Sequence, residues 1–237
     1  MPGNADPAFA TLRVEHTSTV ERTVAELRRA IFEGEVESGT PLREIALAES
    51  LGVSRPTVRE ALAMLVAEGL AVRLPHRGVS VATPEAESVR DVCRARWVLE
   101  GSGVLAWPDA DAEARAHVRR CLEAYTAAVR EHEAAEARGA ASEQGYQQLN
   151  TLHLAFHVSL VGLTGSPRLV AMAENLVVEL KLALAQVERL ARNAHDQADS
   201  HTALVELLER DDVAGAHAFL RAHLEDAEDE IITALRL

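Results

Sequence analysis

Several ingredients are scarce in this chain of 237 residues, and each shortage excludes a class of protein. Two cysteines, Cys93 and Cys121, are too few for a disulfide framework, so we expect free, buried thiols. No apolar run approaches the roughly 18 residues that a membrane-spanning helix needs, and the N-terminus lacks an apolar signal segment. We therefore expect a cytoplasmic protein. Aromatic residues make up only 3% of the chain, so its core should be aliphatic.

One segment carries a specific signal, because residues 51–70 have the pattern of the turn and second helix of a helix-turn-helix. Ser54 can cap that helix by accepting hydrogen bonds from the free backbone N–H groups of its first turn. Pro56 falls in the same turn, where a missing N–H costs nothing. An i, i+4, i+7 spacing predicts one buried face, made of Val58, Leu62 and Leu65. DNA is therefore the first partner to consider.

The start of this predicted helix carries the candidate DNA-reading side chains Arg55, Thr57 and Arg59. The two arginines are four residues apart and share a helix face, and each guanidinium matches O6 and N7 of guanine in the major groove. The alternative is that they are ordinary solvated arginines. Arg43, at the start of a short helix predicted over 43–51, is a candidate phosphate contact, and a capping or surface role fits it equally well.

A β-hairpin, or wing, is predicted after this helix. Two short apolar runs, 70–74 and 79–82, flank the turn sequence 75–78, so the unit is a winged helix-turn-helix. Arg77 at the tip of the wing can reach the DNA backbone or the narrow minor groove. We expect a flexible arm over 1–15 and the DNA-binding domain over 16–83.

The net charge of −13 disfavours DNA binding, but this charge is unevenly divided along the chain. Residues 1–83 hold 9 basic and 11 acidic residues, whereas the remainder holds 15 basic and 26 acidic ones, so most of the acidity belongs to the second part. Phosphate contact depends on local charge. The acidic part should weaken binding to random DNA and favour operators that offer good base contacts.

The second part, 84–237, shows no strand signal and is predicted to be an all-helical bundle. Thr83, Pro84 and Glu85 form a helix-start signal with a cap, a first-turn proline and an early carboxylate. The expected helices, separated by polar, Gly or Pro breaks, are 84–106, 110–137, 143–163, 167–192, 196–209 and 212–235.

These motifs resemble the FadR branch of the GntR family of transcriptional regulators, whose effector domain is the all-helical FCD type. The N-terminal resemblance rests on Gly52 to Arg55, Val58 to Leu62, Glu68 to Leu70, and Arg77 with Gly78. The C-terminal one, which covers the whole second domain, rests on Arg96 to Glu100, Phe156-His157, Gly165 to Pro167, His201, and Ala222 to Leu224. The resemblance implies a homodimeric repressor of metabolic genes that binds a two-fold symmetric operator and responds to a small effector.

The FCD resemblance also implies a divalent metal held by a carboxylate and three histidines, which here are His157, His201 and His223. The carboxylate position, four residues before the first histidine, is His153, a departure from the usual Asp. Four neutral imidazoles would leave the full charge of the metal uncompensated. They favour Zn²⁺, with Ni²⁺ or Cu²⁺ as alternatives, over Mg²⁺, Ca²⁺ or Mn²⁺. Such a site would attract an organic acid effector, with Arg96 as a second contact.

Alternatives stay open for each of these residues. The histidines can be core or interface residues satisfied by hydrogen bonds, and His153 can contact the effector instead of the metal. Arg96 and Glu100, four apart, can form a purely structural ion pair. We expect surface or structural roles for the other histidines, which are His16, His76, His117, His132, His195 and His217.

Two other functions compete with the ligand-responsive regulator. In a metal-sensing regulator, the metal itself is the effector. A metalloenzyme is the weakest alternative, because residue 154 is Leu where a zinc hydrolase of the HExxH type needs a catalytic Glu. A fourth imidazole would also tend to close the coordination position that catalysis needs.

Overall fold

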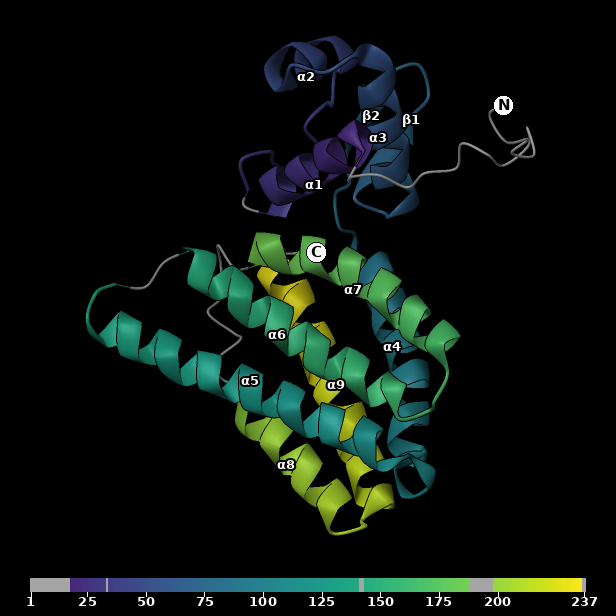
Figure 1. Ribbon diagram of the computed structural model, residues 1–237, viewed down its shortest axis with the longest axis vertical. Helices are drawn as coiled ribbons and strands as arrows, with labels where there is room; N and C mark the ends of the chain where they lie inside the picture. The colour runs from purple at the N-terminus through teal and green to yellow at the C-terminus, as the bar shows by residue number, and fades with distance from the viewer. Residues whose placement is uncertain (1–17, 33, 141–142, 188–197, 236–237) are drawn as a thin grey trace, which may run out of the picture.

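The computed structural model describes residues 18–32, 34–140, 143–187 and 198–235. The expected arm over 1–15, His16 and His195 lie outside these residues. Two units follow each other along the chain, a small one that contains a two-stranded sheet and a larger helical bundle (Figure 1). The predicted fold class is therefore confirmed.

The first unit is a winged helix-turn-helix with the elements α1 (Thr19–Phe32), α2 (Glu44–Leu51), α3 (Arg55–Ala67), β1 (Ala71–Leu74) and β2 (Gly78–Val81). A capping box opens α1, in which Ser18 and Glu21 each accept the backbone N–H of the other. Gly52 ends α2 with φ of +65°, a left-handed conformation that glycine adopts without strain and that sets the turn into α3.

The predicted buried face of α3 is confirmed, and it forms the core of this unit together with α1. Val58, Leu62 and Leu65 are all buried against the α1 stripe, which contains Leu27 and Ile31. The strands β1 and β2 pair antiparallel, with Ala71 opposite Val81 and Leu74 opposite Gly78. The expected wing is therefore present, and its inner face closes the same core.

The second unit consists of helices that agree closely with the predicted ones: α4 (Ala86–Leu105), α5 (Ala112–Ala137), α6 (Glu143–Gly162), α7 (Pro167–Val187), α8 (Ala198–Glu209) and α9 (Val213–Leu235). A short 3₁₀ helix, η1 (Trp107–Asp109), joins α4 to α5. Its Trp107 is buried in the largest core cluster of the bundle, which is otherwise mainly aliphatic. No strand occurs among the described residues of this unit.

The two units meet through α7, which lies across the end of the bundle nearest to α1 (Figure 1). Leu182 of α7 is buried within the hydrophobic core of the winged unit, and Val178 packs against the same core. The opposite face of α7 packs on α4 and α6. This helix therefore belongs to both cores and joins the winged unit to the rest of the bundle.

Two local predictions are wrong. The helix predicted from residue 84 begins at Ala86, because Glu85 has an extended backbone and is itself the N-cap residue, so Thr83 and Pro84 precede the cap. Cys93 is buried as expected, whereas Cys121 is only half-buried; both thiols are free. Among the described residues, no helix combines the length and apolar character needed to cross a membrane.

Candidate functional site

The N-terminal end of α3 is built as the sequence predicts. The Ser54 hydroxyl accepts the backbone N–H of Thr57 at 3.2 Å and lies 2.8 Å from the Thr57 hydroxyl. Thr57, a predicted base contact, is therefore half-buried and engaged in the cap. Arg55 and Arg59 keep 57% and 61% of their side chains exposed. The two arginines are the better placed of the three to reach a duplex.

A hollow beside α2, α3 and the wing gathers positive charge. Four arginines line it: Arg43 comes just before α2, Arg55 begins α3, and Arg73 and Arg77 belong to the wing. Arg43 is the N-cap residue of α2, but its side chain makes no capping hydrogen bond and stays exposed. Local charge therefore favours phosphate contact although the whole chain is acidic.

Two carboxylates, Glu44 and Glu49, line the same hollow, and Glu44 contacts arginines. Glu44, the first residue of α2, accepts Arg59 Nε–H at 3.0 Å and Arg59 Nη2–H at 2.8 Å, while Arg55 Nη2 lies 3.7 Å from the same carboxylate. The hydrogen bonds from Arg59 hold the pKa of Glu44 below its usual value. Arg59 is therefore held by a residue 15 positions earlier in the chain.

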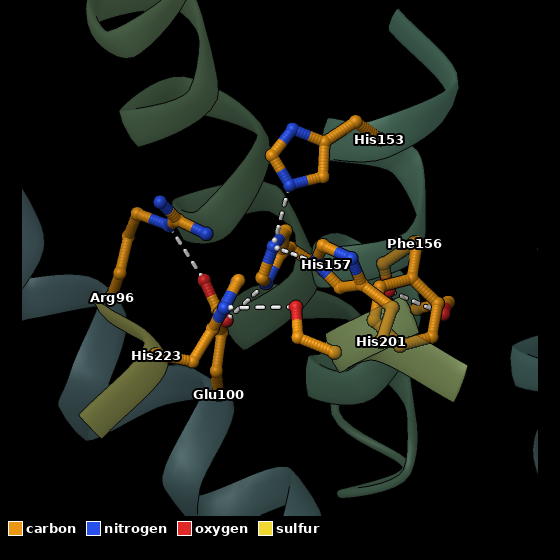
Figure 2. A network of polar contacts seen from close by, with 9 residues as sticks. Arg96, Glu100, His153, Phe156, His157, His201 and His223 are labelled. Carbon is orange, nitrogen blue, oxygen red and sulfur yellow. Dashed lines mark hydrogen bonds and ion pairs between the residues drawn. The ribbon is translucent and has the colours of Figure 1, made fainter. Parts of the chain in front are cut away.

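The second candidate site is a cluster of histidines inside the bundle, drawn in Figure 2. His153 and His157 come from α6, His201 from α8 and His223 from α9. One ring nitrogen from each lies within 4.8 Å of those of the other three, a spacing at which the four could hold a metal ion. The structure thus brings together all four histidines that the sequence singled out.

The distances within the cluster resemble those between ligands of one ion. His157 Nε2 lies 3.1 Å from His153 Nε2 and 3.0 Å from His201 Nε2. Tetrahedral zinc with Zn–N bonds of about 2.0–2.1 Å separates its nitrogen ligands by roughly 3.3–3.4 Å. A single lone pair on His157 Nε2 cannot satisfy two imidazole N–H donors equally well, whereas one cation between the rings would satisfy all three nitrogens.

Glu100 on α4 fixes the orientation of the central ring. Its Oε2 lies 2.7 Å from His157 Nδ1, and its Oε1 accepts Arg96 Nε–H at 2.7 Å. Burial raises the pKa of Glu100, and Arg96 opposes that rise by stabilising the carboxylate. We therefore assign the His157 proton to Nδ1, which donates to Glu100 and leaves the Nε2 lone pair directed at the other histidines.

Two buried polar atoms beside this cluster have no hydrogen-bond partner. One is His223 Nε2, while Nδ1 of the same ring lies 3.4 Å from the Ser200 hydroxyl. The other is Arg96 Nη2, on a side chain that is only 5% exposed. Because buried polar groups are nearly always paired, these two atoms make the cluster a candidate site for an ion or a ligand.

Three histidines of the cluster, His153, His157 and His223, are poor bases. Burial lowers the pKa values of His153 and His157 well below the usual range, and neighbouring histidines and Arg96 add to this. Burial, followed by Arg96, lowers the pKa of His223 to about 4. Neutral imidazoles are the form that binds metal, so these ligands need lose no proton at neutral pH.

Packing holds the cluster rigidly. Tyr125 of α5 stacks on His153, with ring centroids 5.4 Å apart, and the edge of Phe156 meets His201 at 4.9 Å. On α4, a Cβ at Gly103 would collide with the backbone carbonyl of Leu160 on α6. Only glycine permits this close approach, which brings Glu100 of α4 up to His157.

The remaining histidines lie elsewhere. His76 is exposed in the wing turn, and His117 contacts Cys121 at 3.7 Å. His132 is buried on α5, 3.9 Å from Glu136. His217, which stood near the predicted ligands in the sequence, instead packs on Trp97 with ring centroids 4.4 Å apart.

Sequence reasoning missed two residues and one contact of these two sites. Glu44 carried no spacing signal, because its partner Arg59 lies on another helix, and Arg73 lines the hollow from the wing. The Arg96–Glu100 ion pair was predicted from its i, i+4 spacing and is present. The contact of Glu100 with His157, 57 residues away, depends on the packing of α4 against α6 and has no signature in the sequence.

Comparisons with known proteins cover both units. The family model described as "Bacterial regulatory proteins, gntR family" matches residues 19–81, and the FCD domain model matches residues 91–226. The HTH-type transcriptional repressor GlaR of Escherichia coli (strain K12) is 30% identical over 214 residues, which cover 84% of this chain and 89% of that protein. The Nta operon transcriptional regulator of Aminobacter aminovorans is 26% identical over 198 residues, covering 84% and 87%.

A solved structure shares the whole architecture. A putative transcriptional regulator GntR from Rhodococcus sp. RHA1 has a TM-score of 0.73 and 27% identity, covering 92% of this chain and 99% of its own. The Escherichia coli protein McbR/YncC, at 21% identity and a TM-score of 0.68, is similar in fold. The matched families and relatives are transcriptional regulators and not enzymes.

Proposed function

Since the chain belongs to the GntR family and is a ligand-responsive DNA-binding transcriptional regulator, we propose that it represses its target genes until an organic acid binds beside its histidine cluster. The relatives named GlaR and the gluconate operon repressor support repression. The observation that carries the effector site is the convergence of four buried histidines next to an arginine with an unpaired nitrogen.

At the DNA end, we propose that Arg55 and Arg59 read base edges while Arg43, Arg73 and Arg77 contact phosphates. The exposure of the two α3 arginines and their place at the start of the second helix of the helix-turn-helix support this division. The other three arginines line the neighbouring hollow. Thr57 is the weakest of the predicted contacts, because its hydroxyl lies 2.8 Å from that of Ser54.

In the bundle, we propose that His153, His157, His201 and His223 hold one divalent metal, most simply Zn²⁺ or Ni²⁺. The orphaned Nε2 of His223 and the short separations of the other three nitrogens support this fit. Glu100 supplies a carboxylate behind His157 in place of the carboxylate that position 153 lacks. A bound divalent metal would offer a positive centre to which a carboxylate can coordinate.

The charge inventory explains why the effector should be an anion. Arg96 and Glu100 cancel each other, and four neutral imidazoles add nothing, so the charge of a divalent metal would stay uncompensated in a buried site. A carboxylate effector supplies the missing negative charge. Arg96 Nη2 is available to donate to its second oxygen.

We also propose a homodimer that binds a two-fold symmetric operator, one winged unit on each half-site. Exposed apolar side chains on the bundle, Val98 and Leu105 of α4 and Met172 of α7, are available for a subunit contact. Effector binding acts on α6, and α7 packs both on α6 and in the core of the winged unit. A coupling of about 1–3 kcal/mol through this helix would change operator affinity roughly 5–150-fold.

The test begins with metal content per subunit, measured by mass spectrometry on protein purified without a histidine tag, for wild type and for His157→Ala/His201→Ala. We expect near-stoichiometric metal in the wild type and none in the variant. Titration calorimetry of organic acids then compares metal-loaded and metal-stripped protein. Two results would contradict the proposal that a metal anchors the effector. One is a wild type that stays metal-free after soaking, and the other is equal binding of the acid to metal-loaded and metal-stripped protein.

Operator binding in the same samples separates regulator types. If metal alone, without organic acid, releases the DNA, the protein is a metal sensor. If release needs both metal and acid, the metal is the anchor for the effector. Wild type and variant should bind DNA equally well without ligands, because the histidines lie in the bundle and the contacts to DNA lie in the winged unit.

A further inference from the structure

The carboxylate of Glu44 occupies one particular edge of the Arg59 guanidinium. Its two oxygens take the Nε–H and one Nη2–H, at 3.0 and 2.8 Å. A guanidinium has five N–H groups, so this contact leaves both Nη1–H groups and one Nη2–H. One Nη1–H and the remaining Nη2–H form the end edge, and a bidentate contact to O6 and N7 of guanine can use that edge.

This arrangement matters because an unrestrained arginine side chain prefers no particular edge and no particular partner. Next to a duplex, such a side chain binds the nearest phosphate, which carries no sequence information. Glu44 repels phosphate by its charge and already occupies the side edge of Arg59. Its pKa, held below the usual value by Arg59, keeps it ionised at neutral pH.

We propose that Glu44 is a positioning residue that aims Arg59 at base edges and lowers the affinity of the winged unit for random DNA. This inference rests on the proposed base-reading role of Arg59. It assigns to this carboxylate, in a hollow lined by four arginines, the task of improving the ratio of specific to non-specific binding.

Glu49 provides a matched control on the same helix. It is exposed, carries the same charge as Glu44, and makes no side-chain hydrogen bond or ion pair with any described residue. Removing Glu49 changes the charge near the DNA without releasing an arginine. Glu44→Gln separates the same two effects in another way, because it removes the charge but keeps one oxygen that can accept from Arg59.

The experiment uses the full chain and two duplexes: one selected by the wild type from a random-sequence library, and a scrambled version with equal composition. Fluorescence anisotropy gives Kd for both over a salt series. For Glu44→Ala we expect the ratio of specific to scrambled affinity to fall about 10-fold, within the range that one bidentate base contact supplies. Binding to the scrambled duplex should tighten, and its salt slope should steepen by about 0.9, as for one added phosphate contact.

The control variants should separate positioning from charge. Glu49→Ala should change both affinities by the same factor and leave the ratio intact, and Glu44→Gln should lie between wild type and Glu44→Ala. Selection repeated with Glu44→Ala should give a consensus degenerate at the position that Arg59→Ala also relaxes. That loss of base preference is a readout that a merely structural role for Glu44 would not produce.

The outcomes that contradict the inference are distinct from those that contradict the function. If Arg59→Ala lowers the ratio and Glu44→Ala leaves it unchanged, or behaves like Glu49→Ala, Glu44 does not position Arg59. If Arg59→Ala leaves the ratio unchanged, Arg59 does not read bases, and the inference falls with it. If the wild type selects no sequence, the operator-binding function itself is wrong.

Discussion

The molecule contains two arginine–glutamate pairs of nearly equal length in opposite surroundings. Arg59 and Glu44 meet at 2.8 Å in the winged unit, with 61% and 31% of their side chains exposed. Arg96 and Glu100 meet at 2.7 Å in the bundle, with 5% and 3% exposed. The contacts are alike, so solvent decides what each pair can do. In the exposed outer pair, Arg59 can exchange Glu44 for DNA. In the buried inner pair, Arg96–Glu100, no water can replace a lost partner.

This difference matches what the two sites require. A DNA-reading side chain must be aimed and yet free to form new contacts on arrival. A buried ligand site must keep its shape before the ligand binds, because reorganisation at that moment weakens affinity. The inner carboxylate accordingly joins Arg96 to His157 in one chain of contacts, and the outer one joins Arg59 to α2 and has Arg55 nearby.

The largest expected effect comes from breaking the inner pair. Glu100→Ala leaves the buried Arg96 charge without a partner and the His157 Nδ1–H without an acceptor, so the free energy of unfolding should fall by about 3–5 kcal/mol. Urea denaturation of metal-stripped protein measures this loss. The paired change Arg96→Met/Glu100→Leu removes both charges and should recover most of it. A loss below about 1 kcal/mol in the single variant would mean that water reaches Arg96.

The sequence could predict the fold because each element has a local signature. The α3 cap at Ser54, the buried stripe beginning at Val58 and the breaks between the bundle helices all depend on residues close in the chain. The start of α4 was misplaced because Thr83-Pro84-Glu85 fits two cap positions, and only the extended backbone of Glu85 decides between them.

The next effect concerns the acid stability of the histidine cluster in metal-stripped protein. His223 has a pKa of about 4 when folded and an ordinary value of 6.5 when unfolded. Between these pH values, His223 binds a proton in the unfolded chain but not in the folded one. The free energy of unfolding is therefore highest above pH 6.5 and falls as the pH drops toward 4. His223→Gln removes this titration and should flatten the curve by about 2–3 kcal/mol over that range. Equal slopes in both proteins would contradict a buried, neutral His223.

The two sites differ in how much of them the sequence could predict. The family resemblance pointed to all four histidines, and the structure brings them together. It could not reveal that Glu100 contacts His157, because α4 and α6 are far apart in the chain and meet through Gly103. On the winged unit, spacing selected Arg55 and Arg59, but the Glu44 contact spans 15 residues and a change of helix. In both sites, the contact of a glutamate with a side chain on another helix was the part that the sequence could not predict.

A smaller effect is expected from the outer arginine. Arg59→Ala should weaken binding to the selected operator by about 1–3 kcal/mol and relax the preference at one base position. Stability should barely change, because the side chain is mostly exposed. Arg221→Ala, on an equally exposed arginine of the bundle paired with Glu225, is the matched control and should leave operator affinity unaltered. An equal loss on selected and scrambled DNA would make Arg59 a phosphate contact.

The smallest expected effect completes the contrast between the pairs. Glu44→Ala removes an ion pair as short as the inner one, yet water can solvate the Arg59 guanidinium that it leaves behind. The free energy of unfolding should therefore fall far less than in Glu100→Ala, as for other surface pairs. Urea denaturation of Glu44→Ala and Glu100→Ala under identical conditions compares the two directly. A loss at Glu44 as large as that at Glu100 would show that the outer carboxylate holds the winged unit together, and its effect on DNA recognition would then follow from misfolding.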